Sequence, residues 1–198
     1  MNLPNKITVS RIILSIICLL MLSIPFYEFG FEFPTYLVGG KVLIDLKYII
    51  AAVLFIIASI TDFLDGHIAR KNNLVTDFGK VMDAIADKIL VNGILIILAA
   101  DGFIPVIIPV IIITRDTFVD SIKMVAGKSG KAVAASILGK VKTSFMMVGV
   151  SFMLLYNLPF ELIGINFSLA LIWIATILSI LSGVQYFKNH KEALTKEM

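Results

Sequence analysis

The sequence has few of the residues that build disulfide-stabilised and zinc-stabilised folds. Its 198 residues include one cysteine, Cys18, and two histidines, His67 and His190. A single cysteine cannot form an intramolecular disulfide, and histidines 123 positions apart do not match the ligand spacing of a Cys/His zinc site. Both classes of small stabilised fold are therefore excluded.

Charged residues are also scarce. They make up 16% of the chain, whereas a typical soluble domain has about 25%. Hydrophobic residues make up 59%, and the mean hydropathy is +0.98. A water-soluble core of this length cannot hide so much apolar surface, so the composition predicts an integral membrane protein.

Six apolar segments predict six transmembrane helices in an all-α fold. Several charge-free runs are shorter than the roughly 20 residues that cross the hydrocarbon, so charged flanking residues must lie near or within the membrane. The turn residues Asp101-Gly102 and Pro159 support this division. We expect one domain over residues 1–198, with a short interfacial segment around Leu3-Pro4-Asn5. The predicted spans are 10–29, 44–69, 78–100, 102–126, 139–158 and 162–187.

The distribution of lysine and arginine predicts the orientation. With six crossings, both termini and the loops after the second and fourth spans lie on one side of the membrane. Most basic residues fall near that side, whereas Lys41 and Lys47 fall near the other, so both termini are expected to be cytoplasmic. The first 27 residues lack an A-x-A-like cleavage site, so we expect them to remain as the first span of a multi-pass protein of the cell membrane.

Four aspartates flank the loop between the second and third spans. Even the lower estimates of the cost of an aspartate at a membrane helix centre are about 2.5 to 3.5 kcal/mol, so such residues usually face a polar cavity. Asp62 and Asp65 share one helix face, as do Asp83 and Asp87. The two acidic faces lie at similar depth, so we expect them to meet.

Carboxylates that meet in this way repel one another unless cations neutralise them. Oxygen ligands favour hard ions such as Mg²⁺ or Mn²⁺, and two such ions can hold a diphosphate. The pattern therefore predicts phosphoryl-type chemistry. A small cation transporter and a membrane prenyltransferase are the alternatives, although a transporter would have acidic residues along a pathway to both faces.

From Asp62 to Asp87 the sequence reads DxxDGxxARx8GxxxDxxxD, with eight specified residues over 26 positions. This segment resembles the signature of the CDP-alcohol phosphotransferase family at every specified position. The resemblance implies a six-helix membrane enzyme, usually a homodimer, that transfers a phosphatidyl or related group from a CDP-linked donor to an alcohol and releases CMP. No nucleic-acid partner is expected.

The resemblance also implies roles for the residues of this segment. The aspartates that would bind two divalent cations, Mg²⁺ or Mn²⁺, are Asp62, Asp65, Asp83 and Asp87. Among them, Asp87 would also act as the catalytic base that deprotonates the acceptor hydroxyl. The residues of the nucleotide pocket would be Gly66, Ala69, Arg70 and Gly79.

Flanking segments resemble one branch of the family, the bacterial phosphatidylglycerophosphate synthases. Residues 2–11 match NxPNxxTxxR and residues 139–143 match GKxKT, while Arg115-Asp116 resembles the Arg-acidic pair of the fourth span. This likeness implies CDP-diacylglycerol and glycerol 3-phosphate as substrates in phospholipid biosynthesis, with the active site near the cytoplasmic side.

An anionic acceptor needs cations to hold its phosphate. The candidates are Arg115, Lys140 and Lys142, because arginine offers a bidentate fork and lysine a point charge. A local ion pair between Arg115 and Asp116 is the alternative for the arginine. Met146 stands where this branch often has Gln, which leaves other acceptors such as inositol phosphate or serine open.

Overall fold

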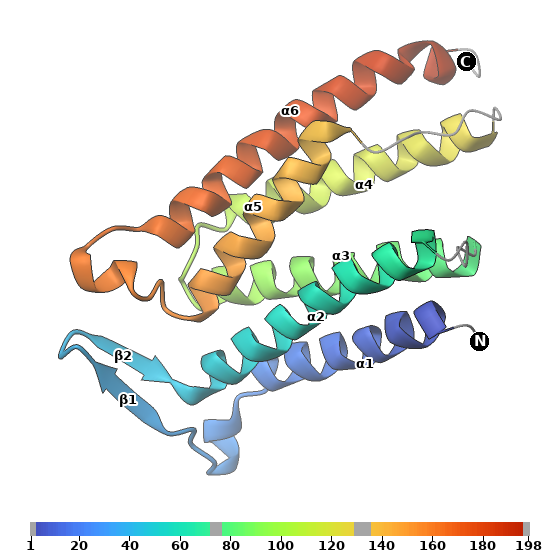
Figure 1. Ribbon diagram of the computed structural model, residues 1–198. Helices are drawn as coiled ribbons and strands as arrows, with labels where there is room; N and C mark the ends of the chain where they lie inside the picture. The colour runs from blue at the N-terminus through green and yellow to red at the C-terminus, as the bar shows by residue number, and fades with distance from the viewer. Residues whose placement is uncertain (1–2, 72–76, 129–135, 196–198) are drawn as a thin grey trace.

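The computed structural model is mostly α-helical (Figure 1). It describes residues 3–71, 77–128 and 136–195, and within these ranges it leaves out the side chains of residues 3–5, 63–71, 77–78, 80, 125–126, 128 and 190–195. The described α-helices are α1 (Leu3–Ser23), α2 (Leu46–Lys71), α3 (Asp77–Ala100), α4 (Ile107–Lys128), α5 (Ile137–Leu154) and α6 (Phe167–Thr195). The shorter elements are the 3-10 helices η1 (Phe26–Phe29) and η2 (Phe160–Ile163) and the strands β1 (Thr35–Val38) and β2 (Val42–Asp45).

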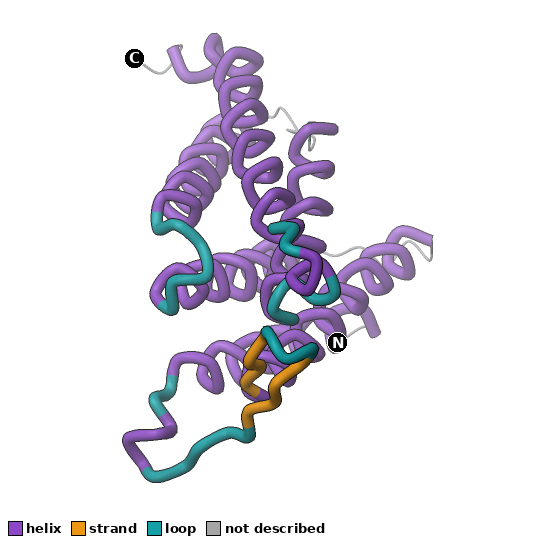
Figure 2. Tube along the Cα trace, turned by 90° about the vertical axis from the view of Figure 1, so that its left-hand side faces the viewer, coloured by secondary structure: helices purple, strands orange, loops and turns teal. Residues whose placement is uncertain are grey.

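The helices pack in two groups. In the first group α1 contacts both α2 and α3, and in the second group α6 contacts both α4 and α5. Contacts of α2 with α5 and of α3 with α4 join the groups. The start of α1, the end of α2, the start of α3 and the ends of α4 and α6 all lie at one end of the bundle (Figure 1). The hairpin formed by β1 and β2 lies at the opposite end, which faces the viewer in Figure 2.

Small residues let the helices approach one another within each group. A Cβ atom on Gly93 of α3 would lie 2.6 Å from Leu19 of α1. A Cβ atom on Gly149 of α5 would lie 2.8 Å from Cγ1 of Ile172 in α6 and 3.2 Å from its backbone nitrogen. Packing of small residues against a facing helix is typical of membrane bundles, where close van der Waals contact drives association.

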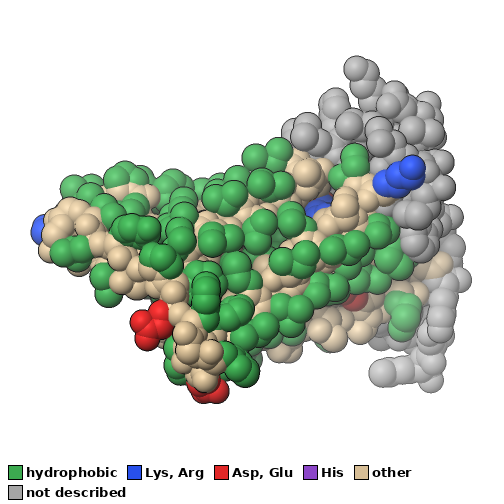
Figure 3. All heavy atoms as spheres, turned by 90° about the horizontal axis from the view of Figure 1, so that it is seen from below, with side chains coloured by type: hydrophobic (Ala, Val, Ile, Leu, Met, Phe, Trp, Pro, Cys, Tyr) green, Lys and Arg blue, Asp and Glu red, His purple; other side chains and the backbone are tan. Residues whose placement is uncertain are grey.

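Large apolar side chains cover much of the outer surface. Ile13, Ile17 and Leu20 of α1 and Ile177 and Leu181 of α6 are all exposed, and hydrophobic side chains dominate the described part of the face shown in Figure 3. Among the described residues, three helical segments are long and apolar enough to cross a membrane: Lys6–Ser23, Ile137–Leu154 and Phe167–Asn189. The fold is therefore a largely α-helical one suited to a membrane.

The sequence did not predict the short hairpin over residues 35–45, which lies between the first two helices of an otherwise helical chain. This segment forms an antiparallel hairpin in which Thr35 pairs with Asp45 and Val38 with Val42. Gly39 and Gly40 have φ angles of 61° and 67°. Glycine adopts this left-handed conformation without steric cost, so these two residues allow the chain to reverse direction tightly.

Helix α1 begins earlier than predicted. It starts at Leu3, so Leu3-Pro4-Asn5 forms the first turn of the helix. Proline is tolerated in a first turn, because the amide hydrogens there have no partner within the helix.

Two later helices begin after the predicted positions. Helix α4 starts at Ile107 instead of residue 102, because Gly102 has a left-handed φ of 78° and Pro105 follows it. Helix α6 starts at Phe167 instead of residue 162, because Gly164, with a φ of 74°, ends η2 first.

Candidate functional site

A buried arginine joins the two predicted acidic faces. Arg11 of α1 forms ion pairs with Asp62 of α2, through Nη1 and Oδ1, and with Asp83 of α3, through Nη2 and Oδ1. The Arg11 side chain is only 3% exposed, whereas those of Asp62 and Asp83 are 28% and 42% exposed. Three helices thus meet around one cation and two carboxylates, at the end of the bundle that carries the start of α1.

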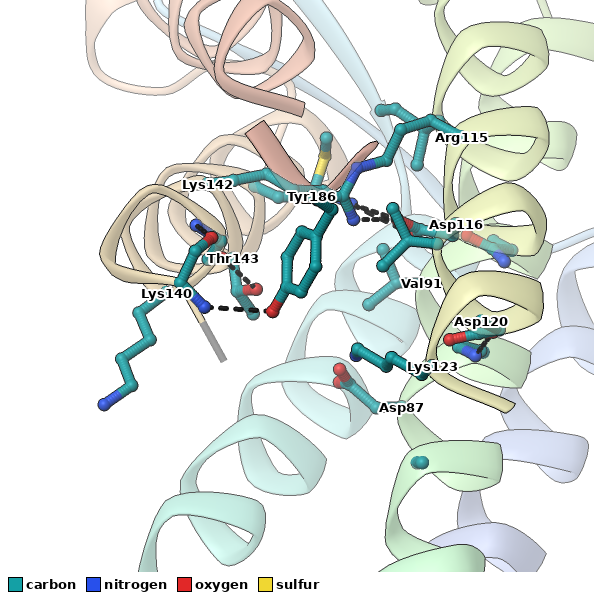
Figure 4. Close-up of a pocket in the computed structure, with 18 of the residues that line it drawn as sticks. Asp87, Val91, Arg115, Asp116, Asp120, Lys123, Lys140, Lys142, Thr143 and Tyr186 are labelled. Atoms are coloured by element: carbon teal, nitrogen blue, oxygen red, sulfur yellow. Dashed lines mark hydrogen bonds and ion pairs between the residues drawn. The ribbon is translucent and has the colours of Figure 1, made fainter. Parts of the chain in front are cut away.

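Asp87 links this carboxylate cluster to a pocket in the second helix group. It lies one turn beyond Asp83 on α3, so the two side chains share a helix face. Asp87 also lines a pocket whose other walls come from α4, α5 and α6 (Figure 4). This aspartate is therefore placed between the two regions.

Four of the predicted site residues belong to the backbone of α2, but their side chains lie outside the described part of the structure. These residues are Asp65, Gly66, Ala69 and Arg70. Gly79 lies in the first turn of α3 and is half-buried.

The described donor set suits a hard divalent cation. Asp62, Asp83 and Asp87 offer only carboxylate oxygens, which are the ligands that Mg²⁺ and Mn²⁺ prefer. The guanidinium of Arg11 shows that positive charge is accommodated between Asp62 and Asp83. Among the side chains that the structure describes, no three acidic, histidine or cysteine residues converge into a ready ligand group.

The pocket beside Asp87 has a volume of about 280 Å³ and is rich in cations. Five basic and three acidic side chains line it, so its charge favours an anion. The basic residues are Lys88, Arg115, Lys123, Lys140 and Lys142, and the acidic residues are Asp87, Asp116 and Asp120. All three predicted acceptor-binding residues are therefore gathered in one pocket with the predicted base.

Asp116 bridges two of these cations. It accepts a hydrogen bond from Nη1 of Arg115 at 2.8 Å and bonds from Nζ of Lys142 at 2.8 and 3.1 Å (Figure 4). The three side chains are between 10% and 17% exposed. The local pairing of Arg115 with Asp116, which the sequence left open as an alternative, is present.

Arg115 is also held by helix α6. Its Nε donates to the backbone oxygen of Ser179 at 3.0 Å, and its Nη2 donates to Oγ of Ser182. A Cβ atom on Gly183 would lie 3.0 Å from Cγ of Arg115, so the glycine leaves space for this side chain. Arg115 thus fixes the position of α4 relative to α6 as well as lining the pocket.

The remaining pocket lysines differ in their pairing. Lys88 forms an ion pair with Asp120. Within the described part of the chain, Lys123 and Lys140 have no acidic partner, although Nζ of Lys123 lies 5.6 Å from the ring centroid of Tyr186. Lys123 and Lys140 therefore carry charge that is available to a bound anion.

The start of α5 is anchored beside the pocket. The backbone nitrogen of Ser136 donates to the hydroxyl of Tyr186 at 3.0 Å, and Oγ of Ser136 accepts from the backbone nitrogen of Gly139 at 3.0 Å. This second bond is an N-cap, which satisfies one of the free amides of the helix start. The anchor sets the positions of Lys140 and Lys142 in the first two turns of α5.

Sequence reasoning did not assign a site role to Arg11, Asp116, Lys123 or Tyr186. A signal was present for Arg11, because it stands immediately before a long uncharged run, and an ionisable residue at such a place usually has a specific partner. The contact of Tyr186 with the start of α5 joins residues 50 positions apart, and no local sequence pattern predicts it.

Comparison with known proteins gives a consistent result. A family model described as CDP-alcohol phosphatidyltransferase matches residues 1–181. A CDP-diacylglycerol–glycerol-3-phosphate 3-phosphatidyltransferase of Bacillus subtilis is 43% identical over 193 residues, covering 98% of this chain and 97% of that protein. Proteins with the same name from Rickettsia bellii and Haemophilus influenzae are 34% and 31% identical, covering 96% and 98% of this chain and 96% and 95% of those proteins.

Proposed function

The chain belongs to the CDP-alcohol phosphatidyltransferase family, whose model matches residues 1–181, and on this premise we propose that it is a phosphatidylglycerophosphate synthase. It transfers a phosphatidyl group from CDP-diacylglycerol to glycerol 3-phosphate and releases CMP, as a transferase of phospholipid biosynthesis. The cationic pocket beside Asp87 carries this proposal, because an acceptor with its own phosphate needs such a pocket next to the reacting centre. The names of the relatives from three bacteria support the same pair of substrates.

Asp62, Asp65, Asp83 and Asp87 would hold two divalent cations, Mg²⁺ or Mn²⁺. Such ions would neutralise the diphosphate of the donor and make CMP a better leaving group. The oxygen-only chemistry of the described carboxylates supports this part of the proposal. The nucleotide end of the donor would lie against the backbone near Gly66, Ala69, Arg70 and Gly79.

Asp87 would act as the base. Its place between the carboxylate cluster and the cationic pocket lets it accept the proton of the acceptor hydroxyl. The acceptor oxygen then forms a bond to the β-phosphorus as the bond to the CMP oxygen breaks, and CMP leaves with that electron pair. Positioning the two reactants in line supplies much of the rate enhancement in such a transfer.

The acceptor phosphate would be bound by Arg115, Lys140 and Lys142. The structure suggests that they contribute unequally, since Arg115 and Lys142 already share Asp116, whereas Lys140 has no acidic partner among the described residues. Lys123, in the same pocket, would add a further point charge. Arg115 would act mainly by holding α4 and α6 in register around the phosphate.

The six α-helices would cross the cell membrane, with both termini and the active site towards the cytoplasm. The three apolar segments support crossing, and the start of α1 and the end of α6 lie at the same end of the bundle, which supports an even number of crossings. We propose a single catalytic domain over residues 1–198 and a homodimeric assembly, as the family resemblance implies.

The reaction is tested by measuring CMP release from purified protein in detergent. The assay contains CDP-diacylglycerol, Mg²⁺ or Mn²⁺, and one acceptor at a time: glycerol 3-phosphate, inositol phosphate, inositol or serine. We expect metal-dependent turnover with glycerol 3-phosphate and little with the others. Preference for another alcohol would overturn the acceptor assignment, and absence of metal-dependent turnover by folded protein would overturn the reaction.

A further inference from the structure

Arg11 occupies an unusual position for a side chain of the first helix. It lies outside the aspartate-rich segment of the sequence, yet its guanidinium pairs with two of the four carboxylates proposed to bind metal. It is almost completely buried, and its Nε has no hydrogen-bond partner among the side chains and backbone that the structure describes. Arg115 differs, because all three of its guanidinium nitrogens donate hydrogen bonds, to Ser179 and Ser182 of α6 and to Asp116.

The contacts of Arg11 are made with carboxylates that we propose as metal ligands. One oxygen of Asp62 and one oxygen of Asp83 receive the two arms of the guanidinium. Arginine thus places a fixed positive charge between the two carboxylates. A divalent cation bound by the same carboxylates would therefore meet a fixed positive charge at close range.

We propose that Arg11 is a built-in counterion of the carboxylate cluster, which neutralises Asp62 and Asp83 when divalent cations are absent and competes with these cations when they bind. The inference rests on the metal site of the proposed function. Arg11 stabilises the metal-free protein, because its positive charge offsets the repulsion between the two neighbouring carboxylates. It also weakens metal binding, which keeps bound cations exchangeable.

The test is the affinity of the full-length protein in detergent for Mn²⁺, measured by titration calorimetry, together with thermal unfolding with and without Mn²⁺. Arg11→Gln removes the positive charge. Arg11→Lys retains the charge on one ammonium group, which cannot bridge both aspartates. Lys6→Gln removes one positive charge from an exposed position of the same helix and is the matched control.

Arg11→Gln is expected to bind Mn²⁺ about tenfold more tightly, because one like charge near a divalent ion has been removed. Its Tm without metal should be lower than that of the wild type, and its rise in Tm on adding Mn²⁺ should be larger. Arg11→Lys should show a smaller gain in affinity, and Lys6→Gln should match the wild type.

Unchanged or weaker Mn²⁺ binding by folded Arg11→Gln would overturn the inference while leaving the proposed function intact, provided that the wild type binds Mn²⁺ and releases CMP. If Arg11→Gln does not fold, Arg11→Lys decides, and unchanged or weaker binding by that variant has the same meaning. Failure of the wild type to bind Mn²⁺ would remove both the inference and the proposed metal site.

Discussion

The two helix groups balance their buried charges in opposite ways. In α1–α3, one cation, Arg11, lies between two aspartates, Asp62 and Asp83. In α4–α6, one aspartate, Asp116, lies between two cations, Arg115 and Lys142. Each arrangement is a triad with one charge left over, negative in the first group and positive in the second.

This difference teaches how one small bundle can recognise two kinds of charged partner. A surplus of carboxylate charge favours cations, and a surplus of basic charge favours phosphate. Additional residues enlarge each surplus, with Asp87 beside the first triad and Lys123 and Lys140 in the pocket of the second. The opposing regions meet at Asp87, where we propose that the proton is transferred.

The largest loss of activity is expected when negative charge is removed from the first triad. In Asp83→Asn, Arg11 keeps one partner but the proposed metal site loses a charged ligand, so CMP release should fall by about a thousandfold or more. The measurement is CMP release at saturating substrates, with folding checked by size-exclusion chromatography. Glu28→Gln, an exposed change at the opposite end of the bundle, is the control. Turnover of folded Asp83→Asn within a few fold of wild type would show that this carboxylate is not a metal ligand.

A second variant removes the acidic residue that the two cations of the other triad share. Asp116→Asn leaves Arg115 and Lys142 without their common counterion, and breaking a buried pair in this way typically costs about 3 to 5 kcal/mol. We expect a lower Tm and a decrease of about tenfold or more in kcat/KM for glycerol 3-phosphate, since Lys142 loses its bonds to Asp116 and Arg115 keeps only those to α6. If glycerol 3-phosphate partly restores the Tm, the freed cations bind its phosphate. If both Tm and kinetics match the wild type, the triad has no role in organising the pocket.

The smallest effect should come from an exposed charge that is not part of a triad. Lys140→Gln should raise the KM for glycerol 3-phosphate about fivefold with little change in kcat, because an exposed cation contributes on the order of 1 kcal/mol to binding a charged partner. The effect should weaken at high salt. Lys188→Gln, an exposed change in α6 outside the pocket, is the control. An equal rise in KM for both variants would mean that general surface charge, and not the pocket, attracts the acceptor.

Periodicity predicted the parts of the molecule that depend on single helices. The expected spans 44–69 and 78–100 lie close to α2 and α3, and helical spacing identified the acidic faces that Arg11 brings together. These features follow from the regular period of an α-helix, so they can be predicted from the spacing of residues in the sequence.

The remaining features depend on contacts between distant segments. The bonds from Arg115 to Ser179 and Ser182 arise only when α4 and α6 pack side by side. The hairpin at residues 35–45 has strands of four residues, which are too short for alternation of apolar and polar residues to be distinguished from a loop. The glycine and proline residues located the starts of α4 and α6 only approximately, because such residues mark a turn without fixing where the next helix begins.

The packing of the helices into two groups has a consequence for how this kind of enzyme can change its specificity. The carboxylate cluster lies on α1–α3, and the cationic pocket is built mainly by α4–α6, with few contacts joining the groups. Under the proposed function, substitutions in the second group would alter the accepted alcohol and leave the donor chemistry of the first group in place. One bundle could then serve different lipid headgroups through changes in a single helix group.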